Sequence, residues 1–524
     1  MATTLFVLSA PFSRVCTIGN LFRTSLFAAL LFLQFAPLGM YAQEKQEKEE
    51  KPAEPPSAAP KEEASVTEHT IRIGEQNIPY KATAGVILLK NAKDEPTALV
   101  YSTSYTRSDL KDMRQRPIAF IYNGGPGSSS IWLHMGAFGP RRVVTMNADS
   151  TPPAPYKLAD NASSLLDKAD LVFIDPVGTG FSHAVGKAQT KDFYGVDPDV
   201  KSLAQFITNY ISRNDRWNSP KFLIGESYGT FRSAALSNYL QSENGVYVNG
   251  IVLISSILQF SPMGDMTYIS LLPTYAASAW YHKVLQDRPE NLNVLIDEAR
   301  HFAETEYASA LMKGARLSAT EKGDLSKKLA RYTGLSEDYL LKANLRVNSG
   351  QFLAELQRSR GLTTGVYDAR FSGFAVNLLS EYVTSDAQSD AITGAFTGAF
   401  NSYVRNELKF GQDKMYHTFD NHEGGGEWEM KHNGNTFPDA GHDLVQAMLR
   451  NPLLQVEVEN GLYDVVTPFF ATEYAMEHLG LPEKLQKNIH LQYYEAGHMM
   501  YVREEDLIKL KNNVGSFIEN SSRQ

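Results

Sequence analysis

Short segments in which apolar residues alternate with polar ones, or run together, begin at Val66 and recur along the chain. Turn-forming pairs such as Gly74-Glu75 and Lys93-Asp94 separate the first of them, a pattern typical of β-strands. The predicted strands cover residues 69–73, 78–89, 97–102, 117–122, 171–174, 221–224, 248–254, 453–458 and 489–494.

Apolar residues three and four positions apart predict helices over residues 230–240, 271–281, 290–311, 320–329 and 504–518. Strands alternate with helices except between about 263 and 445, where the pattern is mainly helical. Such alternation predicts an α/β fold with a mostly parallel sheet. We therefore expect a core in two parts, residues 66–262 and 446–524, with a mainly helical cap insertion over 263–445.

Residues 1–42 differ from the rest. They contain two arginines and no acid, and residues 25–37 are mostly apolar. This pattern is typical of a secretory signal peptide. An uncleaved membrane anchor is the alternative, although the apolar stretch is short for a membrane span. Residues 43–65 contain only Glu, Lys, Gln, Pro, Ala and Ser and are predicted to be a disordered linker.

The chain has 524 residues, a formal charge of −9 and a pI of about 5.8. This acidic balance argues against a nucleic-acid partner. Its one cysteine, Cys16, lies in the predicted signal peptide, so the mature protein would have neither disulfides nor a thiol nucleophile. We expect an exported protein, periplasmic or secreted and bacterial, without stable membrane insertion after the signal is removed.

A Gly-Glu-Ser-Tyr-Gly run at residues 225–229 connects a predicted strand to a predicted helix. This context is the one that a nucleophile elbow requires, because only glycines fit beside so tight a turn. Ser227 is therefore the candidate nucleophile. A chance match in a glycine-containing loop is the alternative reading.

A serine nucleophile needs a base, and the base needs a group that orients it. Asp464 follows the strand predicted at 453–458, and His498 follows the strand predicted at 489–494. Both stand in the order serine, acid, histidine. His442 repeats the local Ala-Gly-His pattern, but it precedes Asp464 and follows no convincing strand. We expect His498 to be the base.

A glycine-rich run, residues 123–130, follows the strand at 117–122. A Gly-Gly turn here would point a backbone N–H group at an oxyanion, and Tyr228 N–H would supply a second donor. A phosphate-binding loop is the weaker alternative, because no Lys-Ser/Thr pair closes the run.

Five motifs together resemble the serine carboxypeptidase family: residues 123–130, 175–182, 225–229, 460–464 and 495–499. The resemblance implies an α/β-hydrolase core and cleavage of C-terminal peptide bonds through an acyl-enzyme, with no cofactor or metal. It implies the roles of nucleophile, orienter and base for Ser227, Asp464 and His498. It implies an oxyanion hole at Gly125 and Tyr228. It also implies that Asn123, Gly124 and Glu226 bind the free C-terminal carboxylate of a peptide, with Met499 lining the adjacent pocket.

Glu226 lies next to the candidate nucleophile. An ionised carboxyl there would repel a substrate carboxylate, whereas a protonated one donates a hydrogen bond to it. This chemistry favours acidic pH. Alternatively, Glu226 only caps the elbow.

The chain departs from the family pattern at several positions. Ile121 stands where relatives usually have Trp, Ala137 where they carry a second acid, and Ser128 and Thr467 where cysteines often occur. The missing Trp and acid weaken the expected recognition of a carboxylate. Arg141 and Arg142 offer an alternative charge, although a solvated pair is the simpler reading.

These departures leave an esterase or acyltransferase with the same three residues as an alternative function. A binding protein with an inert hydrolase fold is the alternative outside the enzymes. A histidine-containing stretch, residues 417–432, lacks the spacing of a metal site and is expected to be a loop. Asn161 begins a glycosylation sequon that is idle in a bacterial protein.

Overall fold

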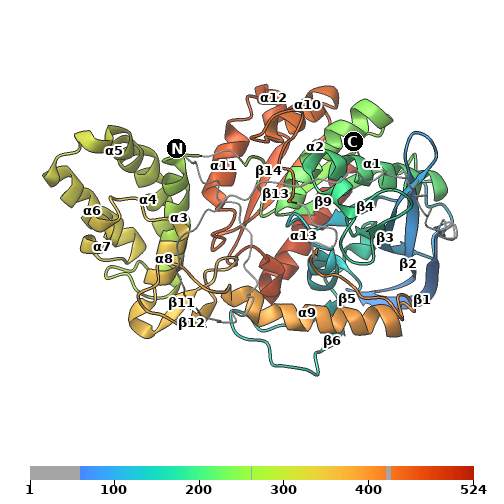
Figure 1. Ribbon diagram of the computed structural model, residues 1–524, viewed down its shortest axis with the longest axis horizontal. Coiled ribbons are helices and arrows are strands. Elements are labelled where there is room, and N and C mark those ends of the chain that lie inside the picture. The colour runs from blue at the N-terminus through green and yellow to red at the C-terminus, as the bar shows by residue number, and fades with distance from the viewer. Residues whose placement is uncertain (1–59, 261–262, 421–426, 524) are drawn as a thin grey trace, which may run out of the picture. The chain divides into compact units, whose positions relative to one another are not determined.

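A ten-stranded sheet forms the centre of the computed structural model, which describes residues 60–260, 263–420 and 427–523 (Figure 1). The strand order is β1-β2-β3-β7-β4-β9-β10-β13-β14, with β8 paired to β3. The strands from β7 to β14 run parallel, and β1, β2 and β3 join them antiparallel. The bounds are β1 (Ala64–Ile73), β2 (Gln76–Lys90), β3 (Pro96–Arg107), β4 (Ile118–Tyr122), β7 (Asp170–Ile174), β8 (His183–Ala184), β9 (Lys221–Glu226), β10 (Gly250–Ile254), β13 (Gln455–Gly461) and β14 (Ile489–Tyr494).

The α/β class with a mostly parallel sheet is therefore confirmed, and each predicted strand overlaps an observed one. One boundary differs. β1 begins at Ala64, inside the segment expected to be a linker at 43–65. Glu63 O accepts a hydrogen bond from Val86 N at 2.9 Å, and Glu62 Oε1 accepts one from Leu88 N at 2.7 Å. Edge pairing uses backbone groups, so it needs no apolar side chains. Residues 1–59, with the predicted signal peptide and most of that linker, lie outside the described residues.

Helices cover both faces of the sheet because alternate residues of its central strands face opposite sides. In β4, Ile118, Phe120 and Tyr122 pack toward α1, α2 and α10. Ala119 and Ile121 pack on the opposite face, toward α9 and α13. The helix bounds are α1 (Val196–Arg213), α2 (Tyr228–Asn244), α9 (Ala387–Asn406), α10 (Gly441–Arg450), α11 (Phe469–Glu477), α12 (Glu483–Gln486) and α13 (Glu504–Ser521).

The stretch expected as a cap, 263–445, packs in two different ways. Helices α3 to α8 and residues 462–470 share a hydrophobic cluster of their own, and these helices gather at one end in Figure 1. Helix α9 instead packs its Phe396 and Phe400 into the core beneath the sheet. The remaining bounds are α3 (Met266–Tyr281), α4 (Leu292–Phe302), α5 (Ala308–Lys313), α6 (Ala319–Thr333), α7 (Glu337–Lys342) and α8 (Ser349–Glu355), with the small strands β5 (Arg141–Val143), β6 (Leu158–Asp160), β11 (Leu362–Thr364) and β12 (Ser372–Phe374).

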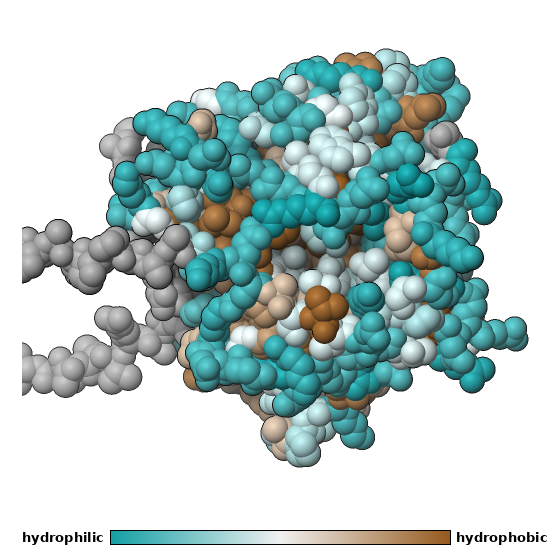
Figure 2. Space-filling model, turned by 90° about the vertical axis from the view of Figure 1, so that its right-hand side faces the viewer, coloured by the Kyte–Doolittle hydropathy of each residue, from teal (hydrophilic) through white to brown (hydrophobic). Residues whose placement is uncertain are grey.

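The surface on the β1–β2 side is mostly hydrophilic, with small separate apolar patches (Figure 2). Within the described ranges, the helices do not include one with the length and apolar character needed to cross a membrane.

Candidate active site

Ser227 lies at the junction between β9 and α2, in a conformation that serine rarely adopts: φ is 59° and ψ is −129°. Its N–H donates to Ile254 O at 3.0 Å. Glycine is required before the serine, because a Cβ on Gly225 would lie 2.1 Å from Gly229 O. A strained residue held between a strand and a helix is the geometry of a nucleophile elbow, which presents the hydroxyl above the sheet edge.

Asp464 and His498 come from the loops after β13 and β14, and they form a buried hydrogen bond. His498 Nδ1 lies 2.7 Å from Asp464 Oδ2. Thr467 Oγ1 donates to the same oxygen at 2.6 Å, while the N–H groups of Val466 and Thr467 donate to Asp464 Oδ1 at 2.9 Å each. The carboxylate is thus fixed by four donors. Burial alone would lower the pKa of His498, but Asp464, with Glu226, outweighs burial and raises it.

The end of β10 connects the two halves of the site. Ile254 accepts from Ser227 N, and Ser255 Oγ donates to His498 O at 2.7 Å. The hydrogen bonds of the described residues do not include one between Ser227 Oγ and His498. Such bonds are often long in an unliganded enzyme and tighten only with substrate. The structure therefore brings the three predicted residues to one sheet edge, with Asp464 and His498 already in contact.

The glycine-rich loop after β4 lies directly against this elbow. A Cβ on Gly124 would lie 2.4 Å from Tyr228 N and 2.7 Å from Glu226 O. Gly125 has a φ of 102°, which an L side chain rarely adopts. The loop and the first turn of α2 are therefore in close contact beside the serine. The oxyanion-hole role of Gly125 and Tyr228 stays a prediction.

Asn123 and Glu226 form a buried polar pair next to Ser227. Asn123 Nδ2 donates to Glu226 Oε1 at 2.7 Å, and Leu133 N donates to Asn123 Oδ1 at 3.1 Å, which fixes the orientation of the amide. Glu226 is 2% exposed. Burial raises the pKa of its carboxyl to about 7, against the lowering effects of His498 and of hydrogen-bonding groups. A carboxyl that keeps its proton near neutral pH can donate a hydrogen bond.

The departures from the family pattern have structural consequences. Ile121 is a core residue of β4, paired with Phe173 and Ile224 in the sheet. Ala137 is buried in a π-helical segment, Leu133–Phe138. Met499 is half-buried and packs at the edge of the core beneath the sheet.

The two arginines form ion pairs with protein carboxylates. Arg141 binds Asp160 and Glu407, and Arg142 binds Glu504. Both side chains are partly exposed and already engaged by carboxylates of the protein.

The other candidate residues lie outside the site. His442 is exposed on α10. His432 Nδ1 contacts Asp197 and its Nε2 contacts Asp443, so it connects its loop to α1 and α10. His422 and Glu423 fall outside the described residues. In the part of the chain that the structure describes, His, Cys, Asp and Glu side chains form no group able to hold a metal ion. Asn161 is buried, and its Nδ2 donates to Ala137 O and Gly139 O.

Sequence reasoning missed three residues of the site. Tyr367, from the segment between α8 and α9, accepts a hydrogen bond from His498 N at 2.7 Å, and its ring lies 5.2 Å from the imidazole. Thr467 is marked in the sequence only as a departure from the family pattern, whereas its hydroxyl donates to Asp464 Oδ2. Tyr501 is the third. Its position three residues after His498 is the one feature of the sequence that could have indicated it.

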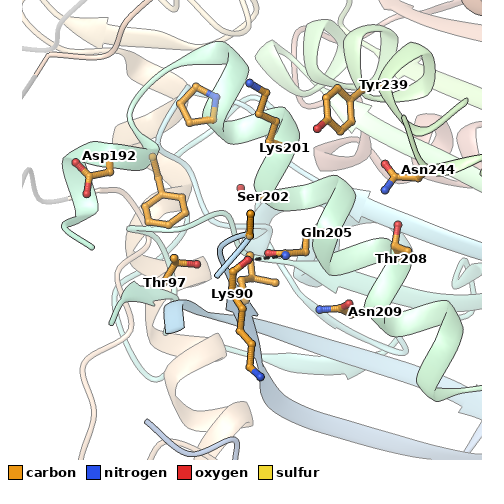
Figure 3. A pocket seen from close by; sticks show the side chains of 14 residues that line it. Lys90, Thr97, Asp192, Lys201, Ser202, Gln205, Thr208, Asn209, Tyr239 and Asn244 are labelled. Atoms are coloured by element: carbon orange, nitrogen blue, oxygen red, sulfur yellow. Dashed lines mark hydrogen bonds between the residues drawn. The ribbon is translucent and has the colours of Figure 1, made fainter. Parts of the chain in front are cut away.

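A surface groove also lies between α1 and the end of β2 (Figure 3). Lys201 and Gln205 of α1 line it, and Gln205 Nε2 donates to Lys90 O at 2.8 Å. The groove shares no lining residue with the site at the elbow.

Comparisons with known proteins agree with this geometry. Serine carboxypeptidase-like 33 from Arabidopsis thaliana is 29% identical over 191 residues, 36% of this chain and 36% of that protein. Pheromone-processing carboxypeptidase KEX1 from Saccharomyces cerevisiae is 32% identical over 162 residues, 29% of this chain and 21% of that protein. The matched parts thus span less than half of these relatives.

The crystal structure of KEX1(delta)p, a prohormone-processing carboxypeptidase from Saccharomyces cerevisiae, superposes with a TM-score of 0.51 and 17% identity. The match covers 84% of this chain and 91% of that one, and it confirms the expected α/β-hydrolase fold. The sequence model described as serine carboxypeptidase matches residues 74–509. A match over that much of the chain shows that it belongs to the serine carboxypeptidase family.

Proposed function

We propose that this chain is a serine-type carboxypeptidase that removes residues from peptides with a free C-terminus. The observation that carries the proposal is the buried Asn123–Glu226 pair beside Ser227. An elbow and an Asp–His pair support ester and amide hydrolysis in general. A protonated carboxyl and an amide donor next to the nucleophile add a site for a substrate carboxylate.

Each step of the reaction uses a group that the geometry supplies. Ser227 Oγ attacks the carbonyl carbon of the terminal peptide bond, and His498 Nε2 takes the hydroxyl proton. Asp464 holds the imidazole through Nδ1–H. The N–H groups of Gly125 and Tyr228 stabilise the negative oxygen of the tetrahedral intermediate. His498 then protonates the leaving amine, and water hydrolyses the acyl-enzyme by the reverse route.

Peptide cleavage depends on the protonation states of two groups, Glu226 and His498. Glu226 must carry a proton to donate to the substrate, and His498 must be neutral to act as a base. The two groups are coupled, because ionised Glu226 is among the groups that raise the pKa of His498. Protonation of Glu226 removes that charge and makes His498 easier to deprotonate. We therefore infer that peptide cleavage favours acidic pH, with the active form carrying its proton on Glu226.

An esterase or acyltransferase is the second candidate function. Ala137, where relatives have a second acid, favours it, because the carboxylate site then lacks one expected partner. An inert binding protein is less consistent with the geometry, since such a protein has no need to keep Asp464 fixed by four hydrogen bonds.

The test compares an N-blocked dipeptide with a free C-terminus against the same dipeptide with a C-terminal amide. We expect kcat/KM to be at least ~100-fold higher for the free acid, and the difference to shrink as pH rises above the pKa of Glu226. A fluorophosphonate should label Ser227, and Ser227→Ala should abolish both labelling and turnover. Equal cleavage of the two peptides by the labelled enzyme would place the esterase or acyltransferase first.

We also propose that residues 1–42 are a cleaved signal peptide, that residues 43–59 connect it to the folded chain, and that the mature protein works in the periplasm or outside the cell, in a bacterial host. The apolar block followed by a charged, proline-containing tract supports this.

A further inference from the structure

Two buried oxygens near the nucleophile have no hydrogen-bond partner among the described residues. They are Glu226 Oε2 and the hydroxyl oxygen of Tyr501, and both residues are only 2% exposed. An unpartnered buried oxygen costs free energy. Two such atoms beside the nucleophile indicate a place where a hydrogen bond forms during function.

Tyr501 occupies space that small residues leave open. It lies in the short helical turn Met500–Val502, immediately after His498, and its ring packs on Gly136. A Cβ on Gly136 would lie 2.6 Å from that ring. Gly136 is followed by Ala137, the position of the second acid in relatives. The tyrosine ring therefore fills room next to the position where a longer, acidic side chain is expected.

The Tyr501 hydroxyl lies near both members of the carboxylate-binding pair. Its pKa is raised well above the usual value, first by burial and then by Glu226, while Asn123 acts in the opposite direction through its side chain. Glu226 Oε1 already accepts from Asn123, so Oε2 is the oxygen left for the phenol.

We propose that Tyr501 is a positioning residue that replaces the missing second acid, with its phenol donating to Glu226 Oε2 and holding that carboxyl for the substrate. This inference rests on the proposed carboxypeptidase function. A phenol differs from an acid in its effect on charge. A donated hydrogen bond stabilises the ionised carboxylate, whereas a second carboxylate would destabilise it.

The consequence concerns the pH range of peptide cleavage. Four titratable groups influence Glu226: His498 lowers its pKa, Asp464 raises it, Tyr501 lowers it, and the Tyr367 phenol faces it from the insertion. Of the two phenols, only that of Tyr501 acts on Glu226 through a hydrogen bond, and Phe removes this donor while keeping the ring. Tyr501→Phe should therefore leave burial as the dominant influence and raise the pKa of Glu226.

The experiment measures kcat/KM against pH for wild type and Tyr501→Phe, on a free-acid dipeptide and on an ester without a free carboxylate. We expect the alkaline limb for the free acid to move up by roughly one pH unit, because the ionised carboxylate loses a hydrogen-bond donor that stabilises it. The ester profile should stay in place. Gly136→Ala, which pushes the ring away, should move the limb in the same direction.

Tyr494→Phe is the matched control, because Tyr494 also donates to a buried glutamate, Glu459, at 2.7 Å, away from the site. It should leave both profiles unchanged. If wild type prefers the free acid but Tyr501→Phe leaves the limb in place, or lowers only kcat and thermal stability, the inference about Tyr501 is wrong while the proposed function stands. If wild type shows no preference for the free acid, the proposed function fails first.

Discussion

At the scale of single residues, the Asp464–His498 pair is the best-defined part of the candidate site. Both oxygens of Asp464 accept hydrogen bonds from fixed donors, and one of those donors is the Nδ1–H of His498. The backbone of His498 is held as well, by Tyr367 O and by Ser255 Oγ. The imidazole therefore has one orientation and one tautomer before substrate arrives.

His498→Ala should reduce kcat by several orders of magnitude, because the serine then has no base. His442→Ala is the control: it removes the same side chain from the same Ala-Gly-His motif, at an exposed position on α10. It should keep kcat within about twofold of wild type. Steady-state kinetics on one peptide would compare them, and an equal loss from both, with unchanged circular dichroism, would contradict the assignment.

At the scale of elements, the site depends on close contact between the loop after β4 and the first turn of α2. Gly124 permits this contact, since any side chain there would overlap backbone atoms of Glu226, Tyr228 and Gly229. Neither a rotamer change nor the movement of a flexible side chain can relieve an overlap with backbone. The elbow and the loop must therefore shift together or separate.

Gly124→Ala should lower kcat by about 10²-fold or more, because it moves the loop that carries Gly125, the proposed oxyanion donor. It should also lower the free energy of unfolding by roughly 1–3 kcal/mol, through overpacking. Gly323→Ala is the control. Gly323 lies in α6, with nothing within 4 Å of an added Cβ. That substitution should stabilise the protein by about 0.5–1 kcal/mol and leave kcat unchanged. Urea unfolding and peptide hydrolysis would measure both.

At the scale of the whole molecule, buried carboxyls make stability depend on pH. Burial raises the pKa of Glu459 to about 8 and that of Glu457 to about 7, and it raises that of Asp175 to about 6. A raised pKa means that the folded state holds the proton more tightly than the unfolded state. The stabilisation is therefore complete below the unfolded values and is lost as pH rises through about 6 to 8. Burial lowers the pKa of His134 to about 3, so this residue destabilises the fold as pH falls below 6.5.

The melting temperature should therefore be highest near about pH 5 and fall toward about pH 8. Glu459→Gln should flatten the fall above about pH 6, because the amide has no proton to lose. Glu75→Gln, in the exposed turn between β1 and β2, should leave the curve unchanged. Differential scanning calorimetry across this range would test the prediction, and an unaltered slope in Glu459→Gln would contradict it.

The sequence by itself determined the features that depend on neighbouring residues. Alternation within short segments predicted the strands, because each residue's side is set by the backbone alone. The glycines at 225 and 229 predicted the elbow, because the whole turn around Ser227 is contained in these five residues. Ser227, Asp464 and His498 each follow a predicted strand of a mostly parallel sheet. The carboxyl ends of parallel strands lie at one edge of the sheet, so the three residues were expected to lie there together.

Only the tertiary structure decided which distant segments meet. Periodicity shows that a face of α9 is buried but not that it packs beneath the sheet rather than with α3 to α8. Nothing local marks Tyr367 as a partner of His498, or the room beside Gly136 as the place of the Tyr501 ring. Contacts between segments far apart in the chain depend on the shape and volume of all the packed groups together. Partners of His498 from distant segments, such as Tyr367 and Ser255, were for that reason visible only in the folded molecule.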